Sequence, residues 1–67
     1  MNFLMSGRTD VADAISALAA AGFESVQLPW GGGLPGAWLS VPGDASPETA
    51  AAVTVIVLRV DPDAVKI

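Results

Sequence analysis

The stretch "VTVIVLRV", from Val53 to Val60, decides the fold that we expect for this chain. β-branched residues dominate it, and such residues are enriched in strands. Successive side chains of a strand point to opposite faces. In this stretch both faces are then apolar: Val53, Val55 and Val57 on one, and Thr54, Ile56, Leu58 and Val60 on the other. Only Arg59 interrupts the apolar run.

An edge strand that is apolar on both faces promotes aggregation unless something covers it. Two interpretations follow. The strand lies in the centre of the sheet, or it is buried against another chain. The low charge content of the sequence favours the second interpretation, so we expect self-association through Val53, Val55 and Val57.

The size of the chain also favours self-association. A chain of 67 residues is one domain, residues 1–67, and folding hides only about 60% of the surface of so short a chain. Small domains usually gain stability from disulfides, metals or oligomerisation. Cysteine and histidine are both absent, which leaves oligomerisation and predicts no metal site and no cofactor.

The charge pattern excludes several classes of partner. The net charge is −4, from three cations and seven carboxylates, so no basic patch for nucleic acid can form. The longest apolar tract, residues 50–58, is far shorter than the roughly 20 residues of a membrane-spanning helix. No secretory signal is recognisable. We therefore expect a cytoplasmic protein, and its richness in Ala, Gly, Val and Asp suggests a bacterial or bacteriophage origin.

The first half of the chain predicts a strand, a helix and a second strand. The strand is "NFLM", residues 2–5. The helix begins with a cap at Thr9 or Asp10, and Gly22 ends it in the left-handed conformation. One helix face carries an apolar stripe: Val11, Ala14, Ile15, Leu18 and Ala21. "ESVQL", residues 24–28, then alternates as a half-exposed strand does.

The second half predicts a strand, a short helix and the long strand described above. "AWLSV", residues 37–41, alternates, and Pro42 and Gly43 form a turn. Ser46 caps a helix that has Pro47 at its first position and ends near Ala52. The closing "DPDAVKI" is expected as a turn and a tail, with room for a short strand at its end.

The predicted order of strand, helix, strand, strand, helix, strand defines an α+β fold. It resembles the ferredoxin-like plan, an antiparallel sheet with one main helix and one short helix on one face. The resemblance is to a topology and involves no specific motif. A truncated variant with fewer strands is the alternative, because the second helix is expected to be barely two turns long.

Two segments are candidates for binding. The turn at Gly7, Arg8 and Thr9 precedes a helix, whose N-terminal N–H groups can hold an anion. The stretch "LPWGGGLPGAW" places Trp30, Leu34 and Trp38 around a loop of glycine and proline. Tryptophan is enriched at binding hot spots, so these three residues either bind a partner or anchor the hairpin to the core.

Catalysis is not expected. Without His, Cys or Tyr, acid–base chemistry would fall to seven carboxylates and one lysine. No serine has an obvious base beside it. The sequence therefore predicts a small non-enzymatic interaction or regulatory module, which binds another protein and forms a homodimer. The alternative is a regulatory domain that binds an anion or another small ligand.

Overall fold

A computed structural model of the chain describes residues 1–28, 37–43 and 46–67. The four strands in this part of the chain form one sheet in the order β2-β3-β1-β4, and all neighbouring strands are antiparallel. The fold is therefore a small α+β fold with two helices. The elements along the chain are β1 (Asn2–Leu4), α1 (Arg8–Ala20), β2 (Val26–Leu28), β3 (Trp38–Ser40), α2 (Pro47–Val60) and β4 (Val65–Lys66).

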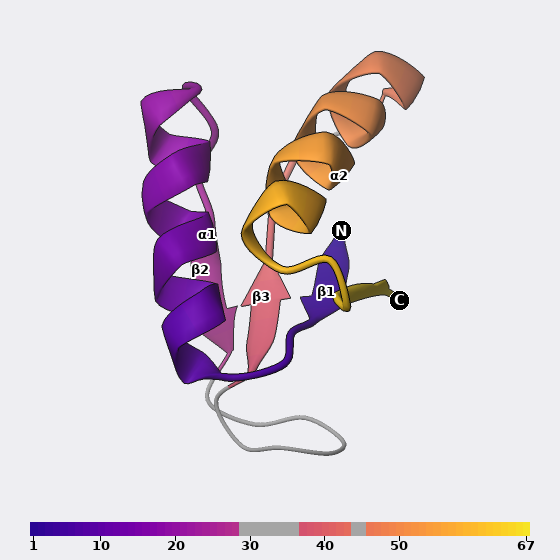
Figure 1. Cartoon of the computed structure of the whole chain (residues 1–67). Coiled ribbons are helices and arrows are strands. Elements are labelled where there is room, and N and C mark those ends of the chain that lie inside the picture. The colour runs from indigo at the N-terminus through magenta and orange to yellow at the C-terminus, as the bar shows by residue number, and fades with distance from the viewer. Residues whose placement is uncertain (29–36, 44–45) are drawn as a thin grey trace.

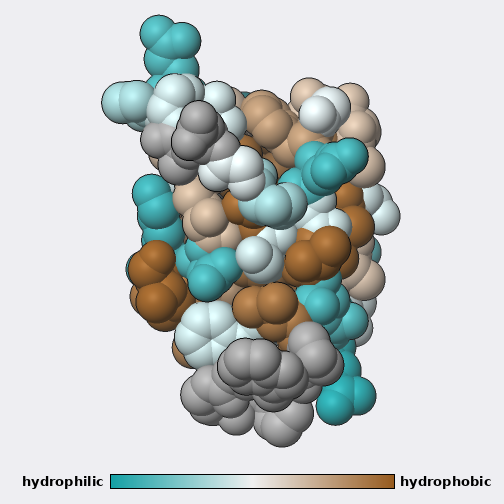
Figure 2. Space-filling model, turned by 180° about the vertical axis from the view of Figure 1, so that it is seen from behind, coloured by the Kyte–Doolittle hydropathy of each residue, from teal (hydrophilic) through white to brown (hydrophobic). Residues whose placement is uncertain are grey.

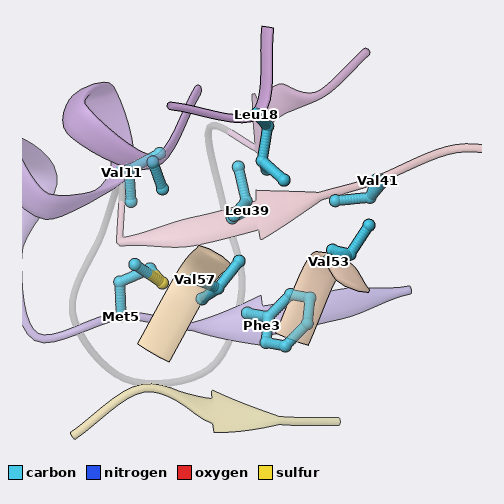
Figure 3. Packing of buried hydrophobic residues seen from close by; sticks show 9 residues of the cluster. Phe3, Met5, Val11, Leu18, Leu39, Val41, Val53 and Val57 are labelled. Carbon is cyan, nitrogen blue, oxygen red and sulfur yellow. The ribbon is translucent and has the colours of Figure 1, made fainter. Parts of the chain in front are cut away.

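Both helices cover the same face of the sheet (Figure 1). The hydrophobic core lies between this face and the helices, and Figure 3 shows its side chains converging from β1, β3, α1 and α2. Its fully or nearly fully buried members are Phe3, Met5, Val11, Ala14, Leu18, Leu39, Val41, Val53 and Val57. The predicted strands at residues 2–5, 24–28 and 37–41 are confirmed, with slightly shorter bounds.

Helix α1 forms much as its sequence predicts. Val11, Ala14 and Leu18 are buried on one side of it, at the spacing of a helical stripe. Gly22 has a φ of +88°, and the N–H of Phe23 donates to the Leu18 carbonyl at 2.8 Å, as in a glycine-ended helix. The predicted cap is wrong, however. The helix begins at Arg8 with Gly7 as N-cap, and no side chain caps it.

The segment that was predicted as the last strand is a helix. Helix α2 begins at Pro47, as predicted, and the hydroxyl of Ser46 accepts a hydrogen bond from the Thr49 N–H. It does not stop near Ala52 but continues to Val60. The last strand is instead the short β4, at the end of the chain.

Helical spacing explains why α2 continues. Val53, Ile56, Val57 and Val60 recur at intervals of three and four residues, and all four are buried or partly buried against the core. No breaker separates this stripe from the three alanines before it; Pro62 is the first. Valine is a poorer helix former than alanine by less than about 0.7 kcal/mol per residue, so burial of the stripe decides the conformation.

The helix separates the three valines that were predicted to share one face. Val53 and Val57 are fully buried in the core of this chain, whereas Val55 is 50% exposed on the opposite side of α2. Consecutive helical residues are about 100° apart, which places positions two apart on different sides. The argument for self-association from an uncovered edge strand is therefore wrong.

Truncation of two valines tests this helical assignment. Val57→Ala is expected to lower the free energy of unfolding by about 2 kcal/mol, because it removes two buried methyl groups and leaves a cavity. Val55→Ala should change it by less than about 0.5 kcal/mol. Urea denaturation measures both. Equal losses at the two positions would contradict the helix, because only a strand places them on the same face.

Candidate interaction surface

The register of the strands defines what lies on the sheet face that the helices leave uncovered. Residues directly opposite each other on neighbouring strands share a face. Leu28 is opposite Trp38, Trp38 is opposite Leu4, and Leu4 is opposite Val65. These four side chains form one row across all four strands, and Leu4 lies on the opposite face from its neighbours Phe3 and Met5. The row is apolar from edge to edge.

A second row lies beside the first. It consists of Val26, Ser40 and Asn2, and the N–H of Ile67 donates to the Asn2 carbonyl at 2.9 Å, which continues the row on the last strand. Val26, Val65 and Ile67 are 52%, 54% and 66% exposed. We call the two rows together the uncovered sheet face. Figure 2 shows this side of the molecule, where separate brown, hydrophobic groups lie across the middle with teal and pale groups between them.

This distribution differs from the usual one at the edges of the sheet. An antiparallel sheet with one solvated face normally presents polar side chains to water. Here the row on the helix side is polar at both edges, where Gln27 and Lys66 flank Leu39 and Phe3. The uncovered sheet face carries no charged side chain in either row. Such a face is suited to contact with another apolar surface.

Helix α2 presents a second, smaller apolar surface. Val55 and Leu58 are 50% and 40% exposed, and they are three residues apart, so they lie on the same side of the helix. Ala51 and Ala52 precede them and Arg59 follows, all exposed. This stripe is the outer side of the segment from which self-association was predicted, and Val55 is the one predicted residue that remains on it.

The structure places Trp38 on the sheet. It is the first residue of β3, is half-buried, and belongs to the first row of the uncovered sheet face. Trp30 and Leu34, the other two predicted partner-binding residues, lie outside the described residues. Trp38 therefore lies in the strand that the sequence predicted over residues 37–41 and contributes to a surface that spans four strands; the sequence left open whether it binds a partner or anchors the hairpin.

The predicted anion site lies beside a carboxylate of the chain itself. The Asp61 carboxylate accepts hydrogen bonds from the Ser6 N–H at 2.7 Å and the Ser6 hydroxyl at 3.0 Å. Ser6 immediately precedes Gly7, Arg8 and Thr9, the three predicted anion-binding residues. A negative charge already lies at this turn, which disfavours the binding of a further anion there.

Asp61 joins two segments that are distant in the sequence. It ends α2, is only 4% exposed, and connects this end to the turn that precedes α1. Its carboxylate also accepts from the Asp63 N–H at 3.1 Å, which closes the turn predicted around Pro62. Burial raises the pKa of Asp61. The hydrogen bonds from Ser6 and Asp63 together lower it by more than burial raises it, so the pKa of Asp61 lies below the ordinary value.

One hollow on the surface has a polar group in its lining. It lies between α1 and β2, has a volume of about 470 Å³, and is bordered by Ile15, Ala19, Phe23, Ser25 and Val26 among others. The hydroxyl oxygen of Ser25 is buried and has no hydrogen-bond partner within the described residues. A buried polar atom without a partner is unfavourable by about 1–3 kcal/mol, but this oxygen has almost no accessible surface, so a ligand in the hollow would reach it only after the Ser25 side chain turns towards it.

A second hollow, of about 450 Å³, lies between α1 and α2 and is lined by alanines of α1 and by Ile56, Arg59 and Val60 of α2. The described residues contain no group of three or more acidic side chains that could hold a metal ion. Neither α1 nor α2 is both long and apolar enough to cross a membrane. Comparison with protein-family models, curated proteins and solved structures finds no match to this chain. The proposals below therefore rest on the sequence and the structure of this chain alone.

The Asp61 contacts predict a specific dependence of stability on pH. Above about pH 5 the carboxylate is charged in the folded chain and almost fully charged in the unfolded chain, so its contribution is complete. The contribution is lost as the pH falls through the lowered pKa of the folded chain. Asp61→Asn should lower the free energy of unfolding at pH 7 by about 2 kcal/mol and weaken the acid dependence.

Asp63→Asn is the matched control, because it removes one negative charge and leaves the Asp63 N–H in place. It should leave both the stability at pH 7 and the acid dependence nearly unchanged. Urea denaturation between about pH 2 and pH 7 covers the titration of the carboxyl groups. Identical behaviour of the two variants would show that the Asp61 contacts contribute nothing.

Proposed function

We propose that this chain is a small, non-enzymatic protein-interaction module that acts as a homodimer. One observation carries the proposal. Among the described residues, five large hydrophobic side chains remain exposed after the core is filled: Val26, Val55, Leu58, Val65 and Ile67. The chain has only ten charged residues among 67, which is below the usual quarter of a globular domain. Three of these side chains lie on the uncovered sheet face and two on the outer side of α2, and apolar surface that is gathered in this way usually marks a site of protein contact.

We further propose that the domain follows the ferredoxin-like plan. The order of its strands, with β1 between β3 and β4 and antiparallel to both, supports this assignment. The plan accommodates many unrelated functions, so it carries no argument about activity. A cytoplasmic location and a bacterial or bacteriophage origin are also proposals, and they rest on the amino-acid sequence.

A regulatory domain that binds a small ligand is the second candidate. The observation in its favour is the hollow between α1 and β2, with the unpartnered Ser25 hydroxyl in its lining. A thermal-shift series against a panel of small metabolites tests it. A ligand of this hollow should raise the melting temperature, and Ser25→Ala should reduce that increase. No shift with any compound would argue against the candidate.

Sedimentation of the full chain over a range of concentrations tests the homodimer. We expect the average mass to rise from 6.8 kDa towards twice that value between about 10 μM and about 1 mM, a range suited to weak association. The reason is that association removes exposed apolar surface from water. A constant mass of one chain at every concentration would remove the homodimer from the proposal.

A further inference from the structure

We propose that a second copy of this chain docks on the uncovered sheet face, so that the two sheets stack against each other across a two-fold axis. This inference rests on the proposed homodimer and identifies the surface that forms it. The row of Leu28, Trp38, Leu4 and Val65 lies at the centre of the contact. Val26 and Ile67, from the second row, lie beside it.

Charge limits which surface a second copy can use. Two chains that each carry a net charge of −4 repel one another, so they meet most readily through surface without carboxylates. Of the acidic residues in the described part of the chain, Asp10 and Asp13 lie on α1, Glu48 on α2, and Asp61 and Asp63 after it, whereas Glu24 lies just before β2 at the edge of the sheet. A strongly charged partner, in contrast, has no opposite charge to pair with on this face.

The pattern of the face also suits a copy of itself. In a two-fold contact the same patch is used by both subunits, so it must complement itself. The first row is apolar at all four positions. When two copies stack, this row therefore faces apolar side chains of the other copy for any direction of the two-fold axis. Stacked sheets pack about 10 Å apart with their side chains interdigitated, which would bury Val26 and Val65 on opposite edges of the sheet.

The available area allows a dimer of modest affinity. The molecule measures 29 × 18 × 18 Å, so the whole of one long side has about 500 Å² in projection, and two facing copies bury at most about 1,000 Å², near the lower limit for a specific interface. The competing surface on α2 offers fewer apolar side chains. Val55 and Leu58 are the two large ones there, and the exposed Arg59 lies directly beside Leu58.

Two matched variants identify the interface. Val65→Lys introduces a charge on the uncovered sheet face, and Val55→Lys introduces the same charge on the outer side of α2. The two valines are 54% and 50% exposed, so neither variant loses core packing. We expect Val65→Lys to raise the dimer dissociation constant about tenfold or more, because burial of an unpaired charge is strongly unfavourable. Val55→Lys should leave the constant within about twofold of the unchanged chain.

Sedimentation equilibrium measures the constants, and circular dichroism with urea denaturation confirms that each variant is folded. If Val65→Lys does not fold, Val26→Lys replaces it, since Val26 lies on the same face at the other edge. A dimer that resists both of these changes and dissociates in Val55→Lys overturns this inference but leaves the proposed homodimer intact. If the unchanged chain stays monomeric at every concentration, both this inference and the proposed homodimer are wrong.

Discussion

Burial of one side of α2 is the constraint on which the rest of this small structure depends. Val53 and Val57 complete the core that Phe3 and Leu39 begin on the sheet, as Figure 3 shows. The strands are only two or three residues long, and so small a sheet has little stability without packing against helices. Because α2 is apolar on more than one side, filling the core leaves Val55 and Leu58 outside it.

Much of the fold could be predicted where a local signal is unambiguous. Gly22 has the positive φ of a helix end, and Ser46 with Pro47 begins the second helix. The segment from Val53 to Val60 was predicted wrongly because almost every position in it is apolar. An alternating pattern and a helical pattern then both fit, and β-propensity favoured the strand. The spacing of the buried residues and the absence of a breaker before Pro62 were the better guides.

The candidate surface could be predicted only in part. Trp38 was identified from its residue type, but the row in which it lies depends on the register between strands, which a single sequence does not specify. The alternation of Val26 and Leu28 indicated a shared face without indicating that the helices leave it uncovered. The role of Asp61 was missed for a different reason. Its contacts with Ser6 join residues that are 55 positions apart in the sequence, and no local sequence pattern predicts such contacts.

The composition of α2 has a consequence for the unfolded chain. Residues 53–60 combine high β-propensity and high hydrophobicity with a single charge and no proline or glycine, which is the pattern of segments that form amyloid-like fibrils. In the native state the backbone groups of this segment are used within the helix, and the Thr54 hydroxyl donates to the Ala50 carbonyl at 2.7 Å. Whenever the helix melts, those groups become available to other chains. The rate at which this helix unfolds therefore limits how fast the segment can pair with other chains, independently of any partner that the folded protein binds.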